Sequence, residues 1–406
     1  MSLPGIVIFA LTYLVISAKR SSWLTLDRPA AALLGAVACV ASGVLSPRAA
    51  LEAVDGSTLL LLFGMMGMGA FLALDGSFDQ LEQRLSAGVR TPARLLGWVL
   101  WGAGLASALI TNDAVCVLGA PLVVRLIQRH RLPPLPFLLA LATGANTGSV
   151  ATLVGNPQNM LCGVLGGLSY REHLVLMLPV ALAGLGLNHL ILHARFRRSL
   201  AAARLAPAEP SEPWPPGSGL TLLAIGGSVV VYLLGANLAW TAAGGFGLLL
   251  LVRRSDPRAV WPRIDWALLV FFAALFVVVR GFSESGAPDA LFARFPLHAG
   301  GGLLGLLRLA GIFLVGSNLV SNVPFILVVR DQMAVLPDPR LGWELLAMAA
   351  TFAGNLTLLG SVANIIVAEA ARDVGGIGFW DYLKIGLPVA LSTTLLGVAW
   401  LAFAVH

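Results

Sequence analysis

Residues 144–159, GANTGSVATLVGNPQN, decide the fold because this polar stretch lies inside a long apolar segment, 135–168. Asn, Thr, Ser and Gly favour helix ends and turns over helix interiors, and Pro favours the first turn of a helix. Backbone groups at membrane depth find no hydrogen-bond partner in lipid, so a helix can break there only against protein or water. The stretch therefore predicts a broken helix that lines a polar site.

The composition of the whole chain is that of a membrane protein. Of its 406 residues, 58% are hydrophobic and 11% are charged, whereas a soluble domain carries roughly 25% charged residues. Apolar runs of about 17–20 residues, long enough to cross the hydrocarbon core, recur from end to end. The first run, 4–18, is followed by Lys19 and Arg20 and by no clear cleavage site, which indicates a retained spanning helix. We expect an all-α, multi-pass membrane protein.

Several function classes lack their usual sequence signals. No G-x-x-x-x-G-K-[ST] loop is present, which argues against a self-contained ATP-driven pump and leaves open an ATPase partner. The three cysteines are scattered through apolar stretches and predict neither a disulfide framework nor a zinc site. Neither H-E-x-x-H nor G-x-S-x-G occurs, so we expect no enzyme and no cofactor.

The series of apolar segments occurs twice along the chain. The first half, 1–201, is expected to hold scaffold helices over 4–74, a helix hairpin at 93–127, the broken helix at 135–168 and a helix at 174–194. The second half, 220–406, is expected to hold scaffold helices over 220–280, a hairpin at 299–335, a broken helix at 343–371 and a helix at 384–404. Residues 202–219, rich in Pro, Glu and Ser, suit a solvated cytoplasmic linker.

Asparagines mark the repeat at a nearly constant spacing. The asparagines 112, 146 and 159 are followed 210, 209 and 205 residues later by Asn322, Asn355 and Asn364. Internal repeats are typical of secondary transporter folds, in which broken helices from two halves meet near the middle of the bilayer.

The distribution of basic residues indicates how the chain crosses the membrane. If 93–127 and 299–335 are re-entrant hairpins, each half crosses five times and the two halves are inverted. With both termini outside, the inner loops then hold 19 of the 26 Lys and Arg residues and the outer loops hold six. The positive-inside rule expects this asymmetry. If both hairpins spanned the membrane fully, the loops would alternate sides differently and the basic residues would be less clearly separated. We therefore predict about ten transmembrane helices in the inner membrane, and the basic net charge needs no nucleic-acid partner.

Residues at the hairpin tips and helix breaks are the candidate substrate- and ion-binding set. Helix N-termini at the tips suit an anion or a polar solute, and unwound carbonyls suit a coupling cation near Asn112, Asp113 and Asn146, with no resident metal. Plain helix–helix turns and polar contacts between packed helices are the alternative interpretations. The set comprises Thr111, Asn112, Asp113, Asn146, Thr147, Gly148, Ser149, Asn156, Asn159, Ser321, Asn322, Asn355, Thr357, Gly360, Ser361 and Asn364.

Asp113 is the only carboxylate that the pattern places deep in the membrane. A charge there costs about 2.5–3.5 kcal/mol on insertion scales. A proton carrier or a ligand of a coupling cation would justify this cost. A protonated Asp113 that only caps a helix is the structural alternative.

The motifs resemble those of the ion transporter superfamily, which includes arsenite permeases, related Na⁺/H⁺ antiporters and divalent-anion/sodium symporters. The similarity covers nearly the whole chain and is sharpest at TNDAVCVLGAPLVV (111–124), SNLVSNVP (317–324), AGNLTLLGSVANIIVAEAA (353–371) and the stretch quoted first. The resemblance implies a dimerising scaffold domain, a mobile transport domain and elevator-type alternating access.

The function expected on this basis is proton- or cation-coupled transport of a small oxyanion or its neutral acid, with arsenite the leading candidate. Thr111-Asn112-Asp113 looks like the hairpin tip of arsenite permeases. A single deep carboxylate without a cage of cations suits a nearly neutral substrate. Sodium-coupled transport of citrate or succinate is the alternative, a channel is a further class, and the direction of transport is open.

Overall fold

The computed structural model of the chain describes residues 3–17, 26–76, 80, 84, 88–206, 218–253, 256–297 and 302–405, and within these ranges every regular element is a helix. Most of the predicted linker 202–219 lies outside the described residues, as do Lys19, Arg20 and Arg254, which the charge count places on the inner side.

The first half of the chain follows the predicted series of segments with two differences. Within the scaffold stretch 4–74, a short extra helix at 47–53 follows the helix that ends at Ala41. The last helix is longer than the predicted 174–194, because it continues into a basic, solvent-exposed arm. The elements are α1 (Leu3–Ser17), α2 (Arg28–Ala41), α3 (Pro47–Ala53), α4 (Gly56–Leu74), α6 (Pro92–Leu109), α7 (Asn112–His130), α8 (Pro134–Ser149), α9 (Pro157–Leu165) and α10 (Tyr170–Ala202).

The second half repeats the order, with short 3₁₀ turns and one additional short helix between the main elements. The elements are α11 (Ser218–Leu233), α12 (Leu238–Val252), η1 (Pro257–Ala259), η2 (Trp261–Arg263), α13 (Trp266–Ser283), α14 (Ala287–Arg294), α15 (Gly302–Val320), α16 (Asn322–Met333), α17 (Pro339–Leu356), η3 (Leu358–Gly360), α18 (Val362–Ala370), η4 (Arg372–Val374) and α19 (Phe379–Ala404).

Helix length and hydropathy define a multi-pass membrane protein. Within the described residues five helices are long and apolar enough to cross a bilayer, namely α4, α10, α13, α15 and α19. Four shorter apolar helices accompany them, namely α1, α2, α11 and α12. The number of ten crossings and the outer location of the termini stay predictions.

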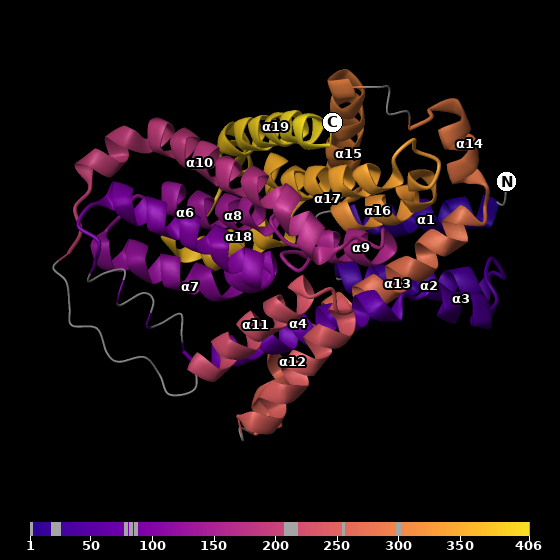
Figure 1. Cartoon of the computed structure of the whole chain (residues 1–406), viewed down its shortest axis with the longest axis horizontal. Helices are drawn as coiled ribbons and strands as arrows, with labels where there is room; N and C mark the ends of the chain where they lie inside the picture. The colour runs from indigo at the N-terminus through magenta and orange to yellow at the C-terminus, as the bar shows by residue number, and fades with distance from the viewer. Residues whose placement is uncertain are drawn as a thin grey trace.

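The helices pack as two groups (Figure 1). One group holds α1, α2, α4, α11, α12 and α13, and the other holds α6–α10 and α15–α19. The two groups meet where α9 packs on α4 and where α16 packs on α13. A buried polar cluster fastens the first group, because Asp75 at the end of α4 accepts a hydrogen bond of 2.6 Å from Thr221 and pairs with Arg253.

Glycines allow the closest helix contacts of the second group. The Cα of Gly148 on α8 lies against the backbone of Gly104 on α6, where an added Cβ would stand 2.2 Å from the Gly104 carbonyl oxygen. Without a hydrophobic drive between helices in lipid, such small residues permit the backbone approach that packing requires. This contact holds α6, the first arm of the hairpin, against the broken helix.

Candidate functional site

Both long polar segments break, but later than the sequence pattern suggests. Within the predicted polar stretch 144–159, α8 stays helical through Ser149 and the break spans 150–156. The chain turns where Gly155 approaches Ser149 so closely that a Cβ would lie 2.2 Å from the Ser149 carbonyl oxygen. Pro157 then opens α9, with Asn156 as its cap. Likewise, α17 includes Asn355 and ends at Leu356, one residue before the break that leads into α18.

A matched pair of asparagines closes the two breaks. The Asn159 amide donates to the carbonyl oxygens of Ser149 and Thr152 at 3.2 and 3.0 Å. The Asn364 amide donates to the carbonyl oxygens of Gly354 and Thr357 at 2.7 and 3.2 Å. Each asparagine therefore bonds the residues ten and seven positions before it, so that carbonyls freed by the broken helix are satisfied inside the protein. We call these two contacts the asparagine clamps.

Asn146 joins the two halves at the centre of the site. Its side-chain oxygen accepts hydrogen bonds from the Asn112 amide at 2.8 Å and from the Ser361 hydroxyl at 3.2 Å. Its amide nitrogen donates to the side-chain oxygens of Asn355 at 3.2 Å and Asn364 at 3.0 Å. Asn146 is 1% exposed. One hairpin tip and both broken helices thus converge on a single buried amide.

The hairpin tips contact the breaks of their own halves. At the first tip the Asn112 backbone N–H donates to the Gly155 carbonyl at 2.8 Å, and Thr111 caps α7 by accepting from the N–H of Ala114. At the second tip the Asn322 amide donates to the Gly360 carbonyl at 3.3 Å.

Ser321 stands at the N-cap position of α16 at the second tip. Its side chain makes no capping hydrogen bond, and its backbone has φ 75°. That conformation is strained for any residue other than glycine. Asn322 is itself the first helical residue, and Pro324 follows two residues later within the first turn of α16.

A cavity of about 260 Å³ lies between the two groups of helices. Both tips reach it through Asn112, Asp113, Ser321 and Asn322, and the second break reaches it through Gly360 and Ser361. Its other charged lining residues, Arg28 and Asp265, come from the first group and were not predicted as site residues. An adjoining cavity of about 710 Å³ shares Asp113 and Asp265 with it.

Asp113 does not cap its own helix, because Thr111 holds that position. The Asp113 carboxylate faces the backbone N–H of Ala363 instead, in the first turn of α18. A first-half carboxylate therefore meets a second-half helix terminus at the cavity wall. Capping of α18 stays an alternative to a role in ion binding.

The remaining predicted residues support the site without lining the cavity. Thr147 accepts a hydrogen bond from the Asn355 amide at 3.0 Å, and the Ser149 hydroxyl accepts from the Asn156 amide at 2.8 Å. Thr357 donates to the side chain of Asn318 at 3.2 Å. Gly148 serves close helix packing, as described above. Among the described residues, no group of three or more His, Cys, Asp or Glu side chains is placed to bind a metal.

Sequence reasoning missed several residues besides Arg28 and Asp265. Asn318 donates to the Ala353 carbonyl at 2.8 Å, and the Asn156 amide donates to Thr351 at 3.1 Å. Asn318 lies inside SNLVSNVP, so the motif itself contained the signal. Glu344 is a second buried carboxylate that sequence reasoning did not single out, since it is 1% exposed and its carboxyl group lies 2.6 Å from the His173 ring.

Fold and site define the class of the protein. The fold matches that of the YdaH transporter of Alcanivorax borkumensis with a TM-score of 0.56 at 17% sequence identity, covering 99% of this chain and 96% of that chain. The chain is thus a multi-pass membrane protein with a transporter fold. Residues 12–353 match the family model described as "Citrate transporter", and the chain belongs to this transporter family.

Two relatives match over nearly the full length of the chain. The silicon efflux transporter LSI3 of Oryza sativa subsp. japonica is 32% identical, with 97% of this chain and 96% of the relative covered. The putative transporter arsB of Dictyostelium discoideum is 23% identical, with 97% of this chain and 91% of the relative covered. These similarities confirm the predicted membership of the ion transporter superfamily.

Proposed function

We propose that the chain is a secondary active transporter that moves a small inorganic oxoacid, as the neutral acid or its monoanion, across the inner membrane by elevator-type alternating access. The observation that carries this proposal is the small cavity lined by both hairpin tips and one helix break, with amides, hydroxyls, two carboxylates and one arginine on its wall. A small cavity with a few polar groups on a largely apolar wall suits a small solute that these groups orient by hydrogen bonds.

The charges of the cavity favour a weakly charged substrate. Asp113 and Asp265 provide two carboxylates against the single cation Arg28. A citrate trianion would meet more negative than positive charge, and burying it there would be unfavourable. An undissociated acid with several hydroxyls can donate to Asp113 and accept from the Asn322 amide. The relatives named for silicon efflux and arsenite-type transport favour the same class, so arsenite and silicic acid are the first candidates.

Asp113 is the proposed carrier of the coupling ion. It lines both cavities between the helix groups. The residue before it in the same hairpin tip, Asn112, donates a hydrogen bond to the central Asn146. A carboxylate at this junction can bind a proton or Na⁺ in one state and release it in another. Either ion satisfies this arrangement, and the gradient experiment below distinguishes them.

The two groups of helices support an elevator-type mechanism. The first group supplies the scaffold and, by family resemblance, a homodimer interface. The second group carries the tips and breaks as one body. The matched asparagine clamps, 205 residues apart, support two repeats with the boundaries 1–201 and 220–406. The inversion of the repeats and the outer location of both termini rest on the distribution of Lys and Arg residues.

The test is a gradient-dependent substrate screen on the purified full chain in proteoliposomes. Arsenite, silicic acid, citrate and succinate are offered in turn under an imposed proton or sodium gradient. We expect saturable, gradient-driven flux of arsenite or silicic acid. Non-saturable flux without counterflow would identify a channel instead.

Citrate is the second candidate because of the family match over residues 12–353. Sodium-driven uptake of citrate or succinate with no flux of either oxoacid would establish this alternative and overturn the oxoacid proposal.

A further inference from the structure

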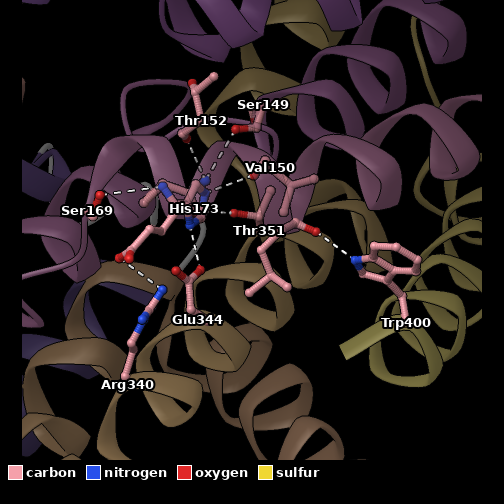
Figure 2. Close-up of polar contacts among 12 residues, drawn as sticks. Ser149, Val150, Thr152, Ser169, His173, Arg340, Glu344, Thr351 and Trp400 are labelled. Carbon is pink, nitrogen blue, oxygen red and sulfur yellow. Dashed lines mark hydrogen bonds and ion pairs between the residues drawn. The ribbon is translucent and has the colours of Figure 1, made fainter. Parts of the chain in front are cut away.

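A second buried polar site lies away from the transport cavity, where α10 packs against α17. His173 and Glu344 approach each other there, with 2.6 Å between Nδ1 of the ring and Oε2 of the carboxyl group. The other ring nitrogen, Nε2, lies 3.1 Å from the carbonyl oxygen of Val150. The His173 and Glu344 side chains are 0% and 2% exposed. Figure 2 shows His173 between Glu344 and the start of the first helix break.

The two contacts of the ring fix the number of protons at this site. A backbone carbonyl only accepts hydrogen bonds, so Nε2 must carry a hydrogen to bond Val150. The short contact between Nδ1 and Oε2 needs a second hydrogen, carried by either partner. The pair is therefore an imidazolium beside a carboxylate, or an imidazole beside a carboxylic acid. Both forms are neutral as a pair and hold the same number of protons.

Loss of that second hydrogen cannot leave both contacts intact. If the remaining hydrogen stays on Nε2, the lone pair of Nδ1 faces the Glu344 carboxylate. If it moves to Nδ1, the lone pair of Nε2 faces the Val150 carbonyl oxygen. Either arrangement also leaves an uncompensated negative charge in a buried position, which is strongly unfavourable. A deprotonated pair must rearrange, and Val150 is the residue with which the 150–156 break begins.

The geometry provides a route for the proton. Glu344 lines a cavity of about 470 Å³. Its Oε1 atom has no hydrogen-bond partner among the described residues. Arg340 and Glu172 form an ion pair of 3.0 Å beside this cavity and are 58% and 52% exposed, so water reaches its mouth. The titratable or charged groups around the pair are Tyr170, Arg171 and Glu172 on α10, Cys162 on α9, Asp338 before α17 and Arg340 on α17.

We propose that His173 and Glu344 form a proton-binding site that fastens the 150–156 break to α10 and α17. When bound, the proton completes a chain of contacts from Glu344 through His173 to Val150. On release it passes to water in the adjoining cavity. The remaining hydrogen then stands on Nδ1, where the Glu344 carboxylate accepts it, and the break loses its hydrogen bond to Nε2 of the ring. The site is separate from Asp113 and does not depend on the substrate.

The test follows the backbone hydrogen exchange of residues 150–156 in the full chain in lipid nanodiscs, without substrate. After correction for the intrinsic pH dependence of exchange, we expect wild-type protection to fall about tenfold between about pH 6 and about pH 9. In Glu344→Gln the new amide can donate to Nδ1 while Nε2–H still bonds Val150, so protection should change less than about twofold.

Glu172→Gln is the matched control. It removes the same charge one residue from His173 without contacting the ring, and we expect it to titrate like the wild type. The proposal would be overturned if wild-type protection stayed constant with pH. It would also be overturned if the protection of Glu344→Gln changed with pH as in the wild type, or if that of Glu172→Gln did not change with pH. If Glu344→Gln does not fold, His173→Asn/Glu344→Gln replaces the pair by two neutral amides with the same expectation. A failed substrate screen leaves this readout unaffected.

Discussion

Replacement of Asn146 by alanine is the sharpest test of the central site. The variant loses four hydrogen bonds. The Ser361 hydroxyl lines the cavity and can bond water there, so the three groups that lose their partner are the Asn112 amide and the side-chain oxygens of Asn355 and Asn364. A buried polar group left unpaired costs about 1–3 kcal/mol. Taking the lower value for three groups, because the cavity admits water beside Asn112, gives about 3 kcal/mol.

This loss can be measured as a shift in melting temperature. With an unfolding entropy of about 2.1 cal/mol/K per residue, about 3 kcal/mol corresponds to about 3–4 °C for a chain of this length. The assay is thermal unfolding in detergent together with gradient-driven flux in proteoliposomes, and we expect the flux to fall at least about tenfold, since 1.4 kcal/mol already corresponds to a factor of ten.

Asn188→Ala is the matched control for this test. Asn188 is also fully buried and bonds Thr143 at 3.0 Å, but it does not line the cavity. The Asn188→Ala variant should have a lower melting temperature than the wild type and the same gradient-driven flux. Wild-type stability and flux in Asn146→Ala would refute the convergence of the two halves on this amide.

Four further outcomes follow from the geometry. Asp113→Asn should abolish gradient-driven accumulation but keep substrate counterflow, and unchanged accumulation would remove this residue from coupling. Arg28→Gln should raise the KM for a charged oxyanion more than for its neutral acid, measured by flux at two pH values. Gly148→Ala should lower the melting temperature by several degrees because its Cβ meets backbone, whereas Gly186→Ala, with nothing within 4 Å, should not. Ser321→Gly should raise the melting temperature by about 1 °C, corresponding to about 1 kcal/mol of relieved strain. A melting temperature below that of the wild type would contradict strain at the second tip.

The sequence predicted the helix order and the residues that meet at the centre because their chemistry is local. Asn156 before Pro157 favours a helix start, and a polar run inside an apolar segment favours a break, although α8 stays helical through Ser149. The spacing of 205 residues between Asn159 and Asn364 indicated two equivalent positions. In the structure each of these asparagines bonds the carbonyl oxygens of the residues ten and seven positions before it.

Other parts of the site could not be predicted because they depend on distant partners. His173 and Glu344 are 171 residues apart, and each alone resembles a polar residue near the end of a helix. Arg28 was counted among the basic residues of an inner loop, yet it lines the cavity. The positive-inside rule assigns a side of the membrane and carries no information on which loop residues turn inward.

The partners of Asn146 have a consequence for biosynthesis. The clamp made by Asn159 lies entirely within its own half, so it can form as soon as that half enters the bilayer. The amide of Asn146 instead donates to side chains 209 and 218 residues further along the chain. A ribosome therefore exposes a first half whose central amide lacks its final acceptors until translation is nearly complete. Chains that terminate early carry this unpaired group, and membrane quality-control proteases can recognise such a defect.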